Sequence, residues 1–414
     1  MKSAHTALGH AGGKAWSFRV FLSAALIAVL QGQVAFGQPA VAPAQERPSV
    51  EKQADDGIRF QGAGRFHRHF GDVVVGRSDR VIGVHRRASE HGVKGHGEIV
   101  YYTSDDHGRT VSKETVLASA EPGRDVRDVA MGTTPRGRVL TVWTDTSVSP
   151  AGPTYFRSAF SDDNGVTWSK PTTFATIPYA YARAYGTIKS FEGGNGRSVL
   201  TVPAYFQINE RPDYKVALYR SEDEGKTWVE GPPIDIHRNG SSESLYTETD
   251  VAWIDPSTGF AVSRSNSGLG VFRSSGGGTD WNLLGRIAKG ERPVAPAAYV
   301  FESQGSKVLL VFYCDRTSNT TRVRWAPVAA LLKNDLSGFA RNMKVLSPPD
   351  MGNASGYQKV AFYPDGTALM VEFREKGKGD KSSDVRLTQV SPSQWIKQEP
   401  PAGGRDGSKK PPAR

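Results

Sequence analysis

The sequence predicts an all-β fold, a six-bladed β-propeller, from two repeated features and from the composition. A short apolar strand recurs along the chain at intervals of 58, 60, 61, 48 and 60 residues. A turn made of Ser, Asp and Gly recurs between these strands. The 45 glycines and 25 prolines among 414 residues favour many short strands joined by turns. A repeat of about 60 residues with strand-length segments has the size of one propeller blade.

The recurring strands begin with a small or charged residue and continue as an alternating apolar run. They are expected at Arg80–Val84, Arg138–Val142, Ser198–Val202, Gly259–Ser263, Lys307–Val311 and Thr367–Val371. We expect the propeller to span residues 58–398, because these 341 residues provide about 57 for each of six blades.

The recurring turns follow the pattern Ser-x-Asp-x-Gly-x-Thr-Trp. They lie at Ser104–Val111, Ser161–Trp168 and Ser221–Trp228, with a degenerate copy at Ser274–Trp281. In such a turn the Asp side chain accepts backbone hydrogens, Gly adopts positive φ and Trp packs back on the strands. The pattern resembles the Asp-box of sialidases and other Asp-box propellers, where the box lies on the outer rim. We therefore expect these repeats to have a structural role.

The two ends of the chain are expected to lie outside the propeller. Residues 1–37 have the order of a signal peptide, because basic residues precede the apolar run Val20–Leu30 and small residues follow it. The eleven residues of that run are too few to span a bilayer, so no stable membrane insertion is expected after cleavage. Residues 38–57 are predicted to be a flexible linker and residues 399–414 a disordered basic tail. The protein is thus expected to be exported, either periplasmic or secreted.

The charge and the cysteine count narrow the classes of ligand. The formal net charge is +10, and residues 58–398 alone carry +7, which favours an acidic carbohydrate as partner over nucleic acid in an exported protein. The single cysteine, Cys314, excludes an intrachain disulfide and a cysteine-based zinc site. Neither an HExxH motif, an EF-hand loop nor a Gly-rich phosphate loop occurs, so no metal and no cofactor are expected.

Five residues near the ends of predicted strands form an ordered set. They are, along the chain, Arg68, Glu248, Arg264, Arg322 and Tyr357. This order of arginines, glutamate and tyrosine resembles the sialidase (neuraminidase) superfamily. The segment Glu248–Ala252 with an arginine after the next strand, and the stretch Val202–Tyr205 (Val-Pro-Ala-Tyr), resemble further segments of that family.

The resemblance implies a role for each residue. Arg68, Arg264 and Arg322 would hold the carboxylate of a sialic acid, with Arg316 and Arg324 as alternatives to Arg322. Tyr357 would be the nucleophile and Glu248 the base beside it. A neutral tyrosine suits this substrate because a carboxylate nucleophile would be repelled by the sugar carboxylate next to the anomeric carbon. Further substrate-binding candidates are Arg87, Tyr205, Arg127 and Asp128, and a purely structural ion pair is the alternative for the last two.

One departure from the family concerns the acid/base residue. The family's aspartate would fall at Lys94, in the loop Ala88–Glu98, and no aspartate occurs between Asp79 and Asp105. His96 is taken as the catalytic substitute, with His91 and Glu90 of the same loop as alternatives.

The predicted function is an exported sialidase-like glycoside hydrolase that cleaves sialic or other nonulosonic acid linkages through a tyrosine nucleophile. Phage endosialidases also lack the usual aspartate, so endo action stays open beside exo action. The alternatives are a noncatalytic sialoglycan-binding propeller, and a propeller hydrolase or lyase for another acidic polysaccharide. A structural assembly factor is a further alternative.

Overall fold

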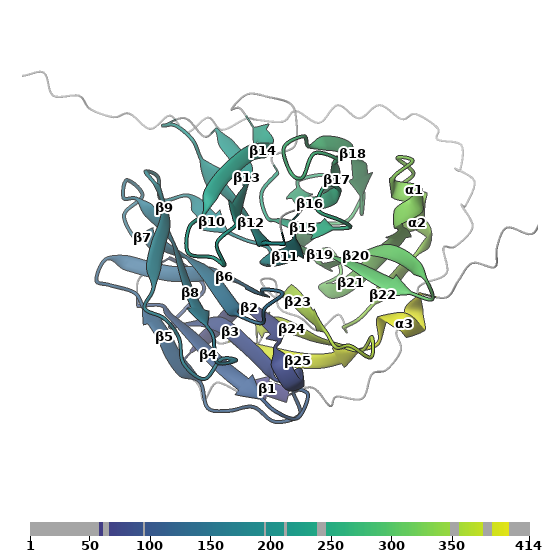
Figure 1. The fold of residues 1–414 in the computed structure, drawn as a ribbon. Helices are drawn as coiled ribbons and strands as arrows, with labels where there is room; N and C mark the ends of the chain where they lie inside the picture. Colours follow the sequence, from purple (N-terminus) through teal and green to yellow (C-terminus); the bar gives the residue numbers. More distant parts are fainter. Residues whose placement is uncertain are drawn as a thin grey trace, which may run out of the picture. The chain divides into compact units, whose positions relative to one another are not determined.

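The computed structural model describes residues 58–60, 66–93, 96–193, 196–210, 213–237, 246–347, 356–375 and 383–396. The predicted signal peptide, linker and basic tail lie outside these residues, as does Lys94. Within the described residues, strands dominate and form five sheets, which confirms the all-β propeller prediction (Figure 1).

Four of the sheets are separate blades. The first holds β6 (Arg124–Thr133), β7 (Val139–Ser147), β8 (Thr154–Ser161) and β9 (Thr172–Ile177). The second holds β10 (Ala182–Ala184), β11 (Lys189–Glu192), β12 (Ser198–Gln207), β13 (Tyr214–Ser221) and β14 (Val229–His237). The third holds β15 (Thr249–Trp253), β16 (Gly259–Ser265), β17 (Gly268–Ser274) and β18 (Asn282–Ile287). The fourth holds β19 (Pro293–Ser303), β20 (Ser306–Asp315), β21 (Thr320–Pro327) and β22 (Met343–Val345).

The remaining sheet joins the two ends of the core. Its eight strands are β1 (Ile58–Phe60), β2 (His67–Val75), β3 (Val81–Ala88), β4 (Glu98–Ser104), β5 (Thr115–Ser119), β23 (Gly356–Phe362), β24 (Ala368–Glu375) and β25 (Ser383–Val390). The antiparallel meanders β2–β5 and β23–β25 meet where His67 pairs with Ser383 in parallel. The prediction of six separate blades is therefore wrong: the structure has four separate blades and one sheet of eight strands. The repeat could not reveal this pairing between residues 316 positions apart.

All six recurring strands predicted from the sequence are found, in β3, β7, β12, β16, β20 and β24. Each is the second strand of its antiparallel meander rather than the innermost one. The innermost strands are β2, β6, β11, β15, β19 and β23, and successive members contact one another in a closed ring (Figure 1). Side chains at the start of these strands can therefore meet, although their residues are far apart in the sequence.

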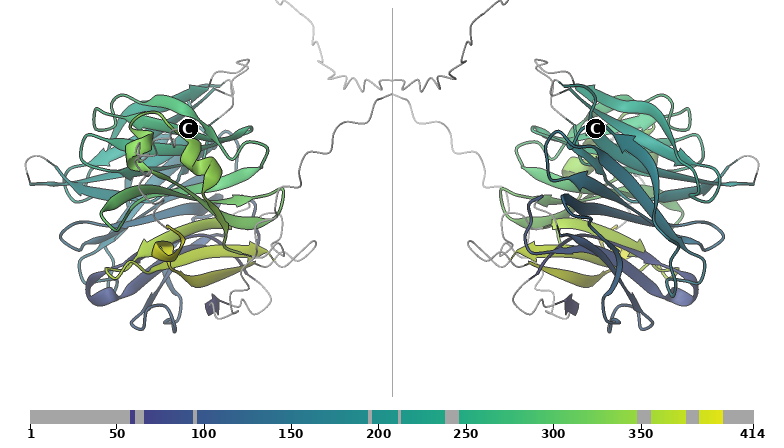
Figure 2. Two further views of the ribbon diagram at one scale, coloured as in Figure 1. Left: turned by 90° about the vertical axis from the view of Figure 1, so that its right-hand side faces the viewer. Right: turned by 90° about the vertical axis from the view of Figure 1, so that its left-hand side faces the viewer.

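The helices are short and lie at the edges of the sheets (Figures 1 and 2). They are the 3-10 helix η1 (Arg77–Asp79) and the α-helices α1 (Val328–Leu331), α2 (Ser337–Arg341) and α3 (Pro392–Trp395). Among the described residues, no helix combines the length and the apolar character needed to cross a membrane.

The predicted turns have the expected local structure. In the turn after β8, Ser161 Oγ donates to Asp163 Oδ1 and accepts from Gly165 N, each at 2.8 Å. The Asp163 carboxylate also accepts from Thr167 N at 2.8 Å, and Gly165 has a φ of 85°. The turns that begin at Ser104 and Ser221 repeat these hydrogen bonds. In the degenerate copy, Asp280 instead accepts from Ser274 and its neighbours.

Apolar side chains fill the space between neighbouring sheets. Val142 of β7 and Val202 of β12 belong to one cluster, each almost fully buried, together with Trp228 from the third turn. Full burial of one such aliphatic side chain stabilises the fold by roughly 1.5–3 kcal/mol. This packing fixes the blades against one another, so that the ends of their inner strands can carry a rigid site.

Buried carboxylates tie the inner strands together. Asp72 of β2 accepts a hydrogen bond from Met131 N of β6 at 2.6 Å. Asp250 of β15 accepts from Thr187 N at 2.9 Å and from Ala298 N of β19 at 2.8 Å. These bonds satisfy backbone groups that face the next blade, where no sheet partner is available.

Candidate active site

Tyr357, Glu248 and Arg264 come together at one end of the ring of inner strands. The Tyr357 hydroxyl donates to Glu248 Oε1 at 2.7 Å, and Arg264 Nη1 donates to the same oxygen at 3.1 Å. The other oxygen, Oε2, accepts from Ala295 N at 2.8 Å. The carboxylate is buried, whereas the Arg264 side chain is 39% exposed, so the guanidinium keeps a surface open to a ligand.

The electrostatics of this group follow from burial and charge. Burial favours neutral Glu248, but Arg264, the Tyr357 hydroxyl and the Ala295 N–H outweigh it and lower the pKa of the carboxyl group. Burial and the charge of Glu248 raise the pKa of Tyr357 well above its usual value, while Arg264 and Arg316 act in the opposite direction. At neutral pH the pair thus consists of a carboxylate that can accept a proton and a neutral phenol that can give one.

Bulges in the inner strands aim side chains into this site. The ladders of β2, β6, β19 and β23 with their neighbours each shift register near the start of the strand. At each shift one non-glycine residue has positive φ: Phe70, Asp128, Ala295 and Tyr357, with values from 53° to 55°. Such backbone is uncommon for these residue types, and bulges beside active sites re-aim side chains. The repetition of the same device in four strands was not predicted from the sequence.

Three predicted arginines lie in other ion pairs. Arg68 of β2 donates to both oxygens of Glu114, at 2.6 and 3.1 Å, and Arg87 donates to Glu114 and Glu98. Arg322 of β21 lies 3.2 Å from Glu291 and 3.1 Å from Asp315. Within the described residues, none of these arginines forms a hydrogen bond or ion pair with Glu248, Tyr357 or Arg264. Arg68 and Arg322 thus have carboxylate partners of their own, whereas Arg264 binds Glu248.

Other arginines do lie near the group of Tyr357, Glu248 and Arg264. Arg316, which follows β20, lies close enough for its charge to act on Tyr357. Arg127 of β6 lies over the Phe70 ring at 5.0 Å, and Phe70 contacts the Tyr357 ring with centroids 4.8 Å apart. Arg316 is one of the alternatives that the sequence left open, and only its neighbours in space distinguish it.

Asp128 contacts two arginines, Arg127 and Arg183. Its Oδ2 accepts from Arg127 Nε at 3.1 Å and lies 3.0 Å from Arg183 Nε of β10. Burial is the main cause that raises the pKa of Asp128, and the charge of Glu248 adds to it. The ion pair considered as the structural alternative is thus present beside the site, and Arg183 is a member that the sequence analysis missed.

Tyrosines line the space next to Glu248. Tyr205 and Tyr185 are buried and belong to the cluster that Tyr357 packs against. The rings of Tyr185 and Tyr357 are 6.2 Å apart, and those of Tyr181 and Tyr205 are 6.1 Å apart. Tyr205, predicted to bind substrate, therefore lies near the nucleophile candidate as part of an aromatic wall.

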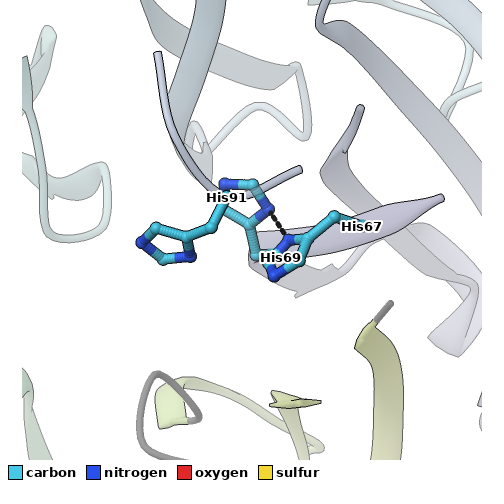
Figure 3. Close-up of side chains that lie close together, drawn as sticks. All are labelled: His67, His69 and His91. Atoms are coloured by element: carbon cyan, nitrogen blue, oxygen red, sulfur yellow. Dashed lines mark hydrogen bonds between the residues drawn. The ribbon is translucent and has the colours of Figure 1, made fainter. Parts of the chain in front are cut away.

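The loop after β3 brings His91, rather than His96, to the centre. His96 is exposed and has a φ of 63°. The His91 ring stacks on His69, with centroids 4.9 Å apart and an interplanar angle of 18°, and lies 5.6 Å from the Phe70 ring. His67, His69 and His91 thus form a cluster in which each offers a ligand atom within 4.8 Å of the others (Figure 3).

Two of the three histidines take part in a chain of hydrogen bonds with a fixed donor and acceptor at each step, and this arrangement fits a metal ion poorly. Arg86 Nη1, which can only donate, faces His69 Nε2 at 3.2 Å, so this nitrogen accepts. His69 Nδ1 then carries the proton and donates to His67 Nδ1 at 2.6 Å (Figure 3). His67 Nε2 in turn donates to Glu375 Oε1 at 3.3 Å. A metal on the two Nδ1 atoms would require the opposite tautomer of His69, with an N–H pointing at Arg86.

Comparisons with known proteins agree with the fold. Residues 93–339 match the model of the BNR repeat-like domain family. No curated protein matches the chain.

Three solved structures illustrate the likeness. A crystal structure of a protein of unknown function from Dyadobacter fermentans has a TM-score of 0.63 at 18% identity, over 80% of this chain and 97% of that one. The Hadza microbial sialidase Hz136 has a TM-score of 0.63 at 16% identity, over 80% of this chain and 66% of that one. The α-L-arabinofuranosidase Arb93A from Fusarium graminearum has a TM-score of 0.56 at 13% identity, over 82% and 99%. At these identities the likeness establishes the propeller fold. Because the family match spans more than half of the sequence, the chain belongs to the BNR repeat-like domain family.

Proposed function

We propose that this protein is a glycosidase that releases sialic or related nonulosonic acids, with Tyr357 as nucleophile and Glu248 as its base. The observation that carries the proposal is the 2.7 Å hydrogen bond from the Tyr357 hydroxyl to Glu248 Oε1, made inside an arginine-lined site. A phenol has an ordinary pKa near 10 and needs a base at hydrogen-bond distance to act as a nucleophile at neutral pH.

The surrounding charges favour an anionic sugar. Arg264 binds Glu248, the charge of Arg316 acts on Tyr357, and Arg127 lies over the Phe70 ring. Guanidinium groups bind carboxylates by paired, charge-assisted hydrogen bonds. We assign the substrate carboxylate to Arg264 and Arg316, with Arg127 as the third arginine in place of Arg68 and Arg322.

The reaction would proceed in two displacements. In the first, the Tyr357 oxygen bonds to the anomeric carbon and gives its proton to Glu248, while the bond to the leaving oxygen breaks and that oxygen takes up a proton. In the second, a water oxygen bonds to the anomeric carbon and gives up a proton, and the Tyr357 oxygen leaves and regains its proton from Glu248. The net change is hydrolysis with retention, and each half is a balanced step.

The family match and the fold support this class of enzyme. One of the similar structures is described as a sialidase and another as an arabinofuranosidase, so this propeller fold occurs in glycosidases of different specificity. The choice of a nonulosonic acid rests on the tyrosine and the arginines rather than on these likenesses.

The test compares two tyrosines that donate to a glutamate at the same distance. The Tyr313 hydroxyl donates to Glu291 Oε2 at 2.7 Å, as Tyr357 does to Glu248. Release of sialic acid from a 4-methylumbelliferyl sialoside, sialyllactose and polysialic acid would be measured for wild type, Tyr357→Phe and Tyr313→Phe. We expect a loss on the order of 10³-fold or more in Tyr357→Phe and near wild-type activity in Tyr313→Phe.

Other results would contradict the proposal. Equal activity in wild type and Tyr357→Phe would exclude this nucleophile. Calorimetric binding of sialyllactose without release would identify a sialoglycan-binding propeller. Inactivity on all sialosides, with an unsaturated product from uronate polymers, would identify a lyase for another acidic polysaccharide.

A further inference from the structure

The loop that follows β3 is held in place on both sides of one histidine. Arg86 Nη1 donates to Glu90 O at 2.9 Å and Arg86 Nη2 donates to Gly92 O at 3.4 Å. Arg86 itself is buried and bound by both oxygens of Asp125, at 2.8 and 2.7 Å from Nη2. The residue between the two anchored carbonyl groups is His91, so Arg86 fixes its backbone position.

Packing fixes the ring of His91 as well. It stacks on the His69 ring and meets Phe70 and Phe373, at 5.6 and 6.3 Å between centroids. Tyr357 contacts the same two phenylalanines, at 4.8 and 5.5 Å. His91 and the proposed nucleophile therefore pack against the same two aromatic rings.

His91 differs from the other two histidines in exposure and in partners. The side chains of His67 and His69 are almost fully buried and hydrogen-bonded to each other, whereas the His91 side chain is 38% exposed. Its Nδ1 is buried 3.9 Å from Glu375 Oε1 and has no hydrogen-bond partner among the described residues. A carboxylate beside Nδ1 would orient the ring and leave Nε2 as the nitrogen that can meet a substrate.

We infer that His91 is the acid/base residue of this site, with Glu375 as its positioning carboxylate. The inference rests on the proposed function. In the first displacement, His91 gives a proton to the oxygen of the leaving group as its bond to the anomeric carbon breaks. In the second, the neutral ring takes a proton from the attacking water and returns to its initial state. A histidine thus replaces the aspartate that the loop lacks, and Arg86 supplies the rigidity that a loop residue needs for this task.

The groups that face His91 are consistent with a proton-transfer role that depends on pH. They are Glu375, Arg127, Arg86, His67 and His69. Among the described residues, Glu375 stabilises the charged ring, whereas Arg127, His67 and Arg86 oppose it. Protonation of His91 is therefore the step that an acidic medium or a bound anionic substrate would promote.

The leaving group provides the test. A 4-methylumbelliferyl group leaves readily without a proton, whereas sialyllactose and polysialic acid expel a sugar hydroxyl that needs one. For His91→Asn we expect kcat/KM on the unactivated substrates to fall about 10²–10⁴-fold, with little change on the aryl sialoside. The limb of the pH profile that falls with rising pH should also disappear. His107→Asn, in an exposed turn, is the matched control, and thermal unfolding of each variant checks the fold.

Several outcomes would overturn the inference while leaving Tyr357 in place. These are an equal loss on aryl and sugar leaving groups, no loss at all, or a leaving-group-selective loss in His96→Asn instead of His91→Asn. A wild-type protein inactive on every sialoside would overturn the proposed function and, with it, the role of His91.

Discussion

Two Tyr–Glu–Arg groups in this protein have the same composition but different surroundings. Tyr357 donates to Glu248 and Tyr313 donates to Glu291, both at 2.7 Å, and each glutamate also binds an arginine. In the second group the Tyr313 hydroxyl also accepts from Arg324 Nε at 2.7 Å, and Glu291 lies between Arg322 and Arg324. Its polar atoms are thus engaged with one another.

The first group keeps capacity for a ligand. Tyr357 sits at a bulge with positive φ, whereas Tyr313 lies inside the regular pairing of β20 with β21. The Arg264 side chain is 39% exposed, whereas the Arg324 side chain is 12% exposed. Arg324 also donates to Phe339 O. The same three residue types therefore occur in two groups, and only the first has an arginine with exposed donors at an open position.

The largest expected difference between the two groups concerns the glutamates. Glu248→Gln removes the base that accepts the Tyr357 proton, so kcat should fall about 10²–10⁴-fold. Glu291→Gln should leave kcat near the wild-type value but lower the free energy of unfolding by about 1–3 kcal/mol, because two arginines lose their counter-charge. Kinetics and urea unfolding of both variants measure this. A similar loss of kcat in both would contradict the distinction.

The arginine of the open group should matter for binding. Arg264→Lys keeps the charge but loses the planar pair of donors, so KM for sialyllactose should rise about tenfold or more. Arg138→Lys is the control, because Arg138 binds a carboxylate through paired donors at a different place, the exposed Asp162 of the second turn. An unchanged KM in Arg264→Lys would remove this arginine from carboxylate binding.

The pH dependence of activity should reflect the site around Tyr357 and Glu248 and not the group around Tyr313. Burial, together with Arg127 and His67, lowers the pKa of His91 to about 4, and the pKa of Glu248 is also below its ordinary value. Catalysis needs His91 protonated and Glu248 ionised, so activity on sialyllactose should be highest at acidic pH. Above about pH 4 it should fall up to about tenfold per unit as His91 loses its proton. A flat profile between pH 4 and 7 would contradict this assignment.

The smallest expected effect concerns the pH dependence of stability and a carboxyl group that belongs to neither Tyr–Glu–Arg group. Burial raises the pKa of Asp72 to about 7, although Lys359 and two backbone N–H groups oppose the shift. Because the folded pKa is above the unfolded one, its contribution is fully present below about pH 4 and is lost as pH rises toward 7. The stability of wild type relative to Asp72→Asn should therefore decline across this range in urea unfolding. A difference independent of pH would show that Asp72 does not titrate there.

Local patterns in the sequence determined much of this protein. The repeated strands and the Ser-Asp-Gly turns depend on neighbouring residues, so their period and hydrogen bonds could be predicted along the chain. The choice of Tyr357, Glu248 and Arg264 also followed from residue types at strand ends. The structure places these three together, and their catalytic roles stay predictions.

Only the tertiary structure decided which other residues join them. The parallel contact between His67 and Ser383 merges the terminal meanders into one sheet, and Arg68 forms an ion pair with Glu114. The anchoring of the loop by Arg86 holds His91, and not His96, against the His69 ring. Each of these results depends on contacts between segments that are distant in the sequence. The free energy of such contacts and the register of the strands are set by packing between blades. A one-dimensional pattern of residue types contains no measure of that packing.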